Sequence, residues 1–244
     1  MSDSASGARR RPLRLFFVRH GQTENFDNPP FNGWRDAQLT ETGRRQLDQM
    51  AEALAAVPFE AVYASDLSRA AYGGRRLAEK RGLDLVTDPQ WREMSFGRWE
   101  GLTYNQIAAE DQALIRRLFS PGGGGADQPF PGGGESSAGF CRRVAEALDR
   151  LKAAHPEGGR VALVAHGGVC KMLWALLLKI PPELAWAVIQ QDFAAVNVAD
   201  LYPGGRVIAH LVNGYVGPEG YHQAGPGLAR LVGESVFDRA ADGK

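Results

Sequence analysis

Apolar runs of strand length alternate with stretches of helical period along most of the chain. The first run, Leu13 to Val18, ends in four consecutive apolar residues and is rich in Phe and Val, which favours a buried strand. The stretch 39–57 repeats apolar residues at three- and four-residue spacing, which predicts a helix with Thr40 as its N-cap. By these criteria the predicted strands are 13–18, 59–65, 83–89, 160–165 and the two arms of a hairpin within 194–212, and the predicted helices are 39–57, 66–82, 102–119, 137–155 and 169–180.

This alternation predicts the fold class. Strands and helices that follow one another in turn are typical of an α/β protein with a largely parallel sheet. Gly73 and Gly74 lie inside the helix predicted over 66–82, and we expect them to weaken its middle. The last predicted helix is stopped by Pro181 and Pro182.

Two segments lie outside the alternation. Residues 1–12 are polar and lack the apolar core of a signal peptide, so we expect a flexible, solvated leader; the Arg9-Arg10-Arg11 run leaves a nucleic-acid-binding arm as the alternative. Residues 120–134 are rich in Gly and Pro, which predicts a loop that is either a lid or a simple mobile connection. The remainder, 13–244, has the length of a single domain.

Charge and cysteine content narrow the function classes. Lys+Arg and Asp+Glu both number 28, so the formal net charge is zero and no overall basic field favours nucleic acid. No apolar run reaches the length of a membrane span, so we expect no membrane partner. The two cysteines, Cys141 and Cys170, form no CxxC pattern. We therefore expect no disulfide framework and a reducing, cytoplasmic location.

Polar side chains collect where the predicted strands end. In parallel sheets, ligands bind beyond the carboxyl ends of the strands. His20 and His166 each stand directly after a strand and before a glycine, so we expect both to face one crevice. The polar residues that follow the strands are Arg19, His20 and Thr23 after the first, Arg69 after the second, Glu93 after the third and His166 after the fourth.

This set of side chains suits phosphoryl transfer. Two guanidinium groups neutralise a dianion and hold its oxygens. A neutral imidazole is a competent nucleophile toward phosphorus, and a second imidazole, when protonated, stabilises the charge that develops on the oxygens. A carboxylic acid protonates the leaving alkoxide and later helps to activate water. Positioning and charge stabilisation are most of what the reaction asks of a protein, so we expect neither a metal nor a cofactor.

Motifs spread from about Leu13 to Leu211 resemble those of the histidine phosphatase superfamily, also called phosphoglycerate mutase-like proteins. "RHG" alone is a weak signal, and it gains force from the second "HGG" and from the arginine and glutamate between them. The resemblance implies a three-layer α/β/α sandwich around a mostly parallel sheet. The matching pieces are "RHGQT" at 19–23, "LTETGRRQ" at 39–46, "YASDLSRA" at 63–70, "EMSFGRWEG" at 93–101, "GES" at 134–136 and "VAHGGV" at 164–169.

The resemblance also implies roles for individual residues. His20 is the implied phosphorylated nucleophile, and Glu93 is the implied proton donor. Glu100 competes with Glu93 for that role, and a structural role is favoured for Glu100. The residues implied to hold the phosphate or line its pocket are Arg19, Gly21, Thr23, Arg69, His166, Gly167 and Gly168.

One position departs from the family pattern. Family members commonly read "RHGxTxxN", in which the asparagine touches the phosphate, and this chain has Phe26 there. Asn25 and Asn28 stand on either side of it. Either asparagine takes over the contact, in which case Asn25 is a candidate substrate-binding residue, or the pocket is more apolar at this point.

Three functions are compatible with the resemblance. The favoured one is a phosphomonoesterase that acts through a phosphohistidine on a small phosphorylated metabolite, because "EMSFGRWEG" resembles phosphatase members and "QQDFAAVNVADL" at 190–201 resembles alpha-ribazole phosphatase-like members. The alternatives are a cofactor-dependent phosphoglycerate mutase and a catalytically silent module that binds a phosphorylated ligand. The tail residues Leu228, Leu231 and Val232 pack either on the same chain or on a second copy, which leaves a homodimer open.

Overall fold

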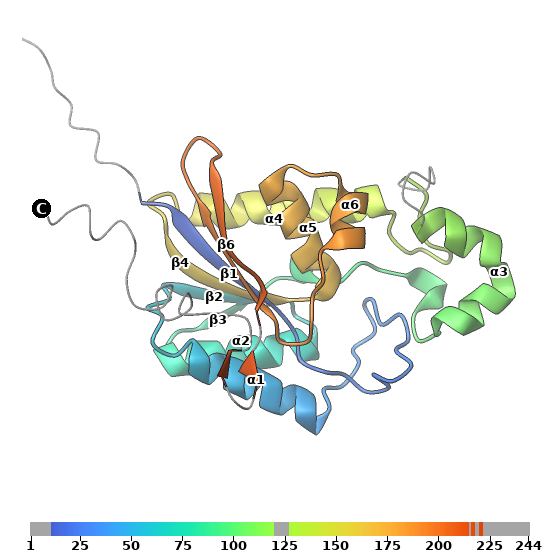
Figure 1. Cartoon of the computed structure of the whole chain (residues 1–244), viewed down its shortest axis with the longest axis horizontal. Helices are drawn as coiled ribbons and strands as arrows, with labels where there is room; N and C mark the ends of the chain where they lie inside the picture. Colours follow the sequence, from blue (N-terminus) through green and yellow to red (C-terminus); the bar gives the residue numbers. More distant parts are fainter. Residues whose placement is uncertain (1–10, 120–126, 215, 218–219, 222–244) are drawn as a thin grey trace, which may run out of the picture.

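The structure is a computed structural model of the chain (Figure 1). It describes residues 11–119, 127–214, 216–217 and 220–221. Most of the expected leader, the first half of the Gly/Pro-rich loop and the tail residues Leu228, Leu231 and Val232 therefore lie outside the described residues. Residues 127–134 of the loop are described and contain turns but no regular element.

A six-stranded mixed sheet forms the centre of the molecule (Figure 1). Its strand order is β3-β2-β4-β1-β5-β6. The first four strands in this order are parallel to one another, and β5 and β6 form an antiparallel hairpin at the other edge. The strands are β1 (Leu13–Arg19), β2 (Ala61–Ala64), β3 (Leu85–Thr87), β4 (Gly159–Ala165), β5 (Val196–Leu201) and β6 (Val207–Gly214), and a separate pair consists of β7 (Val216–Gly217) and β8 (Gly220–Tyr221).

Helices cover both faces of this sheet, and α3 lies to one side of it (Figure 1). Side chains alternate along β1, so Phe16 and Val18 pack with the core under α1 and α2, while Leu15 and Phe17 pack with the core under α4 and α5. The predicted three-layer α/β/α architecture is confirmed. The helices are α1 (Glu41–Ala53), α2 (Ser68–Arg81), α3 (Tyr104–Phe119), α4 (Ser137–Ala154), α5 (Gly167–Leu178) and α6 (Pro182–Val188), with short 3₁₀ turns η1 (Pro89–Trp91) and η2 (Gly97–Trp99).

Most predicted helix ends follow from local sequence. Thr40 caps α1, since its side-chain oxygen accepts a hydrogen bond from the Gly43 N–H, and Gly82 ends α2 in the left-handed conformation. Helix α6 was not predicted, because we took Pro181 and Pro182 only as a stop. Pro182 instead occupies the first position of this new helix, where its missing N–H costs nothing.

Gly73 and Gly74 have a packing role that the sequence did not indicate. A Cβ on residue 73 would lie 2.9 Å from Leu47 Cδ2, and a Cβ on residue 74 would lie 2.8 Å from Leu85 Cδ1. The two glycines therefore let α2 approach both α1 and the sheet closely, and α2 runs through them without a break. The absence of a side chain at both positions is what this close approach requires.

None of the helices in the described ranges is both long and apolar enough to cross a membrane.

Candidate active site

The carboxyl ends of β1 and β4 bring His20 and His166 together. The two strands are parallel neighbours in register, with Arg19 opposite Ala165, and the His20 N–H donates to the Ala165 carbonyl at 2.9 Å. The imidazole centroids lie 5.2 Å apart. Two residues that are far apart in the sequence therefore lie side by side at one edge of the sheet, as the positions of the strand ends predicted, and the cavity described below is lined by neither of them.

The surroundings of His20 define its tautomer. Its Nδ1 lies 2.7 Å from the carbonyl oxygen of Gly21, which can only accept a hydrogen bond, so Nδ1 carries the proton. Burial lowers the pKa of His20 well below the usual 6.5, and the nearby charges of Arg69 and Arg19 lower it further. The ring is therefore neutral, and its Nε2 carries a free electron pair.

His166 is fully buried at the start of α5. Neither of its ring nitrogens has a hydrogen-bond partner within the described part of the chain. Burial lowers the pKa of His166 well below 6.5, and Arg69 and His20 add to the effect. The neutral form is favoured, so His166 offers one N–H donor rather than the two of the protonated ring considered from the sequence.

Arg69 lies in the first turn of α2 and is 1% exposed. Its Nη1 donates to the Arg35 carbonyl and its Nη2 donates to the Gly33 carbonyl, each at 2.7 Å. Its Nε is buried and has no partner among the described residues. Burial lowers the pKa of Arg69 to about 10, which leaves the guanidinium charged near neutral pH.

Arg19 directly precedes His20 and occupies the last position of β1. Its Nη1 donates to the Gln191 carbonyl at 2.6 Å, and its guanidinium stacks 4.1 Å from the centre of the Phe193 ring. Its Nε, like that of Arg69, is buried without a partner in the described ranges. These contacts hold the guanidinium plane in one orientation.

Glu93 is held in an irregular segment between η1 and η2. Its Oε1 accepts a hydrogen bond from the Met94 N–H, and its Oε2 accepts one from the Gly168 N–H, both at 2.9 Å. Gly168 belongs to the first turn of α5, where unpaired N–H groups attract an anion. The carboxylate is thus close to the element that begins directly after His166.

A cavity of about 270 Å³ opens beside this carboxylate. Its lining contains Arg19 and Glu93 from the predicted set, together with Lys171 and Trp186. The Lys171 ammonium donates to the Trp186 carbonyl at 2.9 Å and lies 5.2 Å from the centre of its indole ring. We did not single out Lys171 or Trp186 for the site from the sequence, since Trp186 lies on the unpredicted α6 and only the contact of α5 with α6 places it here.

Glu100 has the structural role that was favoured for it. Its Oε1 accepts hydrogen bonds from the N–H groups of Trp34 and Phe96, and its Oε2 accepts one from the N–H of Arg35. Glu100 thereby organises the loop whose carbonyls hold Arg69. Its oxygens are engaged with backbone rather than directed at the two histidines.

Gly21 and Thr23 both make close packing contacts within the protein. A Cβ on residue 21 would lie 2.2 Å from the Gly43 carbonyl oxygen, so Gly21 is required by the close approach of α1. Gly21 was expected to line the phosphate pocket, and its contacts add a packing requirement that the sequence did not indicate. Thr23 is buried and forms an isolated β-bridge with Leu39, so it supports the backbone that follows His20.

Asn25 and Gly167, the remaining residues expected to bind substrate, differ in how far they lie from solvent. Asn25 is exposed in a turn with a φ of 58°, and its carbonyl accepts a hydrogen bond from the Asn28 N–H. Phe26 is 45% exposed in the same turn. A Cβ on Gly167 would meet Arg19 Nε at 3.4 Å, an ordinary contact, which places Gly167 against the guanidinium. The turn around Asn25 and Phe26 is thus a surface feature, and Gly167 belongs to the buried site.

Known proteins resemble this chain over the part that contains the sheet and the site residues. The profile of the histidine phosphatase superfamily (branch 1) matches residues 15–214. The bifunctional protein Rv2228c of Mycobacterium tuberculosis is 35% identical over 209 residues, which are 85% of this chain and 56% of that protein. This chain therefore spans about half the length of that relative.

Two other relatives are covered over more of their length. Glucosyl-3-phosphoglycerate phosphatase of M. tuberculosis is 36% identical over 178 residues, 70% of this chain and 78% of that protein. Adenosylcobalamin/alpha-ribazole phosphatase of Salmonella typhimurium is 30% identical over 190 residues, 77% of this chain and 92% of that protein. The solved structure of the native mycobacterial glucosyl-3-phosphoglycerate phosphatase matches with a TM-score of 0.73 and 31% identity, covering 83% of this chain and 99% of that one. The sequence motifs, the fold and these matches agree, and the chain belongs to the histidine phosphatase superfamily.

Proposed function

We propose that this protein is a phosphomonoesterase that acts through a phosphohistidine on His20, without a metal, on a small phosphorylated metabolite. One observation carries the proposal: Arg19 Nε, Arg69 Nε and both ring nitrogens of His166 are buried without partners among the described residues. A buried polar group left unpaired costs about 1–3 kcal/mol. Both arginines lie close enough to lower the pKa of both histidines, so these groups surround one place. The oxygens of a phosphate dianion supply the missing acceptors.

The first step forms the phosphohistidine. The free electron pair on His20 Nε2 attacks phosphorus, and the N–P bond forms as the bond from phosphorus to the leaving oxygen breaks. Glu93, as the carboxylic acid, gives its proton to that oxygen, so the oxygen leaves as a hydroxyl group and not as an alkoxide. Arg19, Arg69 and the N–H of His166 stabilise the charge on the other phosphoryl oxygens.

The second step releases phosphate. Water attacks phosphorus, the Glu93 carboxylate takes a proton from that water, and the N–P bond to His20 breaks. Inorganic phosphate leaves, and both His20 and Glu93 return to their starting forms. The two steps together consume one phosphomonoester and one water and produce one alcohol and one phosphate.

The cavity supports a substrate whose leaving alcohol carries a second anionic group. Lys171 brings a positive charge to the wall beside Glu93, and Trp186 supplies an apolar surface next to it. The relatives named above act, by their names, on different phosphorylated metabolites. The substrate of this chain is therefore better inferred from the Lys171 charge in the cavity wall than from the names of these relatives.

The proposal includes a cytoplasmic location. Both described cysteines, Cys141 and Cys170, are free thiols, which suits a reducing compartment.

The test is to trap the intermediate. Brief incubation with a ³²P-labelled phosphomonoester, followed by denaturation at alkaline pH and peptide mapping, should leave an acid-labile phosphate on the peptide that contains His20. His20→Ala should lose both the label and phosphate release. His210→Gln, which changes a histidine paired with Asp200 instead, should keep both. Phosphate release by His20→Ala at the wild-type rate would overturn the assignment, and interconversion of phosphoglycerate isomers without phosphate release would favour a mutase.

A further inference from the structure

Glu93 is the one proposed reactive group that neither belongs to nor directly follows a helix or strand of the sheet layers. His20 follows β1, His166 follows β4, and Arg69 lies in α2, but Glu93 lies between η1 and η2 in backbone without regular hydrogen bonding. A proton donor must nevertheless lie within hydrogen-bond reach of the leaving oxygen. Another part of the molecule must therefore hold this segment in place.

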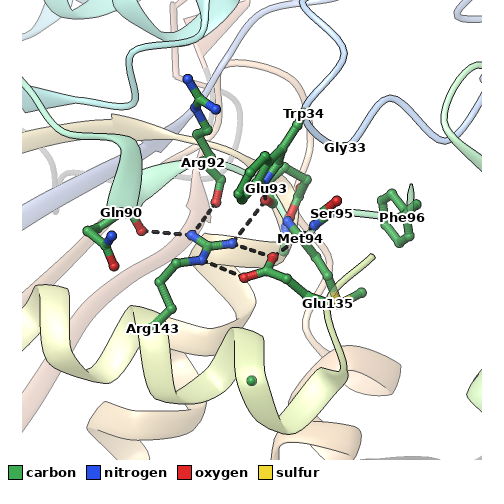
Figure 2. A network of polar contacts seen from close by, with 12 residues as sticks. Gly33, Trp34, Gln90, Arg92, Glu93, Met94, Ser95, Phe96, Glu135 and Arg143 are labelled. Atoms are coloured by element: carbon green, nitrogen blue, oxygen red, sulfur yellow. Dashed lines mark hydrogen bonds and ion pairs between the residues drawn. The ribbon is translucent and has the colours of Figure 1, made fainter. Parts of the chain in front are cut away.

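Arg143 holds the segment from α4 (Figure 2). Its Nη1 donates to the carbonyls of Gln90 at 2.8 Å and Arg92 at 2.9 Å, and its Nη2 donates to the carbonyl of Glu93 at 3.1 Å. One guanidinium thus binds one carbonyl of η1 and two of the irregular segment that follows it, the last of which belongs to Glu93 itself. Trp34 Nε1 donates to the same Glu93 carbonyl at 2.8 Å from the other side.

Glu135 holds Arg143 in turn, as Figure 2 shows. The Arg143 Nε donates to Glu135 Oε1 at 2.7 Å, and Nη2 donates to Glu135 Oε2 at 2.6 Å. The same Oε2 accepts a hydrogen bond from the Ser95 N–H at 2.8 Å, so the carboxylate also binds the segment on the far side of Glu93. The side chains of Arg143 and Glu135 are only 11% and 20% exposed, which limits competition from water.

The geometry requires an arginine at position 143. Its five hydrogen bonds use Nε, Nη1 and Nη2 and occupy the full donor capacity of a guanidinium. A lysine at this position keeps the charge but has three donors on one nitrogen and cannot bind this spread of acceptors. The site at position 143 therefore requires the shape and the donors of a guanidinium as well as its positive charge.

We infer that Arg143 and Glu135 are positioning residues for the proton donor: they fix residues 90–95 so that the Glu93 carboxyl group meets the leaving oxygen. The inference rests on the proposed function, in which Glu93 is the acid. It also assigns a role to the glutamate of the "GES" motif, which the proposed chemistry does not use.

The inference makes a prediction about leaving groups. Phenyl phosphate releases a weakly acidic phenol and depends on a proton donor, whereas 4-nitrophenyl phosphate releases a stronger acid and depends on it much less. The value of kcat/KM reports the step that phosphorylates His20. The ratio of kcat/KM for the two esters therefore measures how well the acid works, and a general loss of folded protein does not change it.

The variants are Arg143→Lys and Glu135→Gln, with Glu93→Gln as the reference. Glu93→Gln should lower kcat/KM for phenyl phosphate by about 10²–10⁴-fold and have a smaller effect on 4-nitrophenyl phosphate. Each positioning variant should shift the ratio in the same direction by about tenfold or more, because a displacement near 1 Å can cost about 10²-fold. Arg143→Lys combined with Glu93→Gln should shift the ratio no further than Glu93→Gln alone, since both changes remove the same acid.

Arg150→Lys is the matched control, because Arg150 lies on the same helix in an exposed pair with Asp88 and should leave the ratio at the wild-type value. A ratio unchanged in Arg143→Lys and Glu135→Gln but shifted in Glu93→Gln would overturn this inference and leave the proposed function intact. A ratio unchanged in Glu93→Gln would overturn both the acid role and the inference. If Arg143→Lys fails to fold, Glu135→Gln decides the question, because it keeps the shape of the side chain while it removes the charge and replaces one acceptor oxygen by a donor.

Discussion

Gly168 and the Glu93 carboxylate are in direct contact. The Gly168 N–H donates to Glu93 Oε2 at 2.9 Å, and a Cβ on residue 168 would lie 2.1 Å from Glu93 Oε1. The second glycine of "HGG" therefore provides both a donor for the carboxylate and the space in which the carboxylate lies. This contact joins the helix that follows His166 to the proposed proton donor.

Gly168→Ala should displace Glu93 and impair catalysis. The new methyl group also falls 3.1 Å from the Trp186 ring, so the carboxylate, the indole or α5 must move. We expect kcat/KM for phenyl phosphate to fall by about 10²-fold, as for a catalytic group misplaced by about 1 Å.

Gly167→Ala provides the comparison for that variant. Its methyl group meets Arg19 Nε at 3.4 Å, which is ordinary packing, so its loss of activity should be clearly smaller. Equal losses in the two variants would show that the space next to Glu93 is not the deciding factor. The measurement is kcat/KM for phenyl phosphate from steady-state kinetics of both variants, and thermal unfolding confirms that both are folded.

The two buried histidines should make stability depend on pH. Burial, together with nearby Arg69, lowers the pKa of both His20 and His166 well below 6.5 in the folded protein. In the unfolded chain both histidines take up a proton as the pH falls through about 6.5. Below that pH the unfolded state therefore binds more protons than the folded state. Their contribution to the free energy of unfolding is therefore fully present above pH 6.5 and is lost as the pH falls toward the folded pKa values.

We expect urea unfolding curves to show a falling free energy of unfolding from about pH 7 to about pH 5, at up to about 1.4 kcal/mol per pH unit for each ring. His166→Asn removes one of the two rings and should make the dependence less steep. A dependence as steep in His166→Asn as in the wild type would contradict a neutral, buried His166.

Lys171 should discriminate between substrates by their charge. Burial and the nearby charge of Arg19 lower the pKa of Lys171, and Glu93 opposes this shift. We expect Lys171→Met to raise KM for 3-phosphoglycerate about tenfold more than for glycerol 3-phosphate, since an ion-paired hydrogen bond contributes about 1.5–3 kcal/mol. The two esters form a matched pair, in which a carboxylate replaces a hydroxymethyl group.

Lys171→Arg restores the charge and should recover most of that difference. An equal rise of KM for both esters in Lys171→Met would show that Lys171 only supports Trp186, whose carbonyl it binds.

A buried ion pair at the start of β1 should matter for stability and not for the reaction. Asp200 is fully buried and accepts hydrogen bonds from Arg14 Nε at 2.6 Å and Arg14 Nη2 at 2.7 Å, and it lies 2.8 Å from His210 Nε2. Asp200→Asn should lower the free energy of unfolding by about 3–5 kcal/mol, because it leaves a buried charge without its counterion.

The control for Asp200→Asn is Asp149→Asn, in the exposed pair with Lys152, which should cost less than about 1 kcal/mol. The kcat/KM of the folded Asp200→Asn protein should stay at the wild-type value, since Arg14 and His20 lie toward opposite ends of β1. A large loss of activity in a stable Asp200→Asn protein would show coupling along this strand.

The helices and strands were largely predictable because their signals are local. Apolar periodicity located the strands of the main sheet and all the long helices, and Thr40 and Gly82 marked helix ends through their own conformational preferences. Helix α6 was missed because Pro182 serves equally as a stop or as a first residue, and the choice depends on the contacts of α6 with α5. The packing roles of the glycines at 21, 73 and 74 were missed for the same reason, since their neighbours come from distant segments.

By itself, the sequence determined the α/β class and the meeting of His20 with His166, because residues that directly follow neighbouring parallel strands must lie at one edge of the sheet. Only the tertiary structure decided how Glu93 is held. Its segment has no periodicity, and its support comes from Arg143, 50 positions away, and from Glu135, 40 positions from Ser95. Hydrogen bonds between irregular backbone and distant side chains depend on how the layers pack, and that packing is a property of the whole fold.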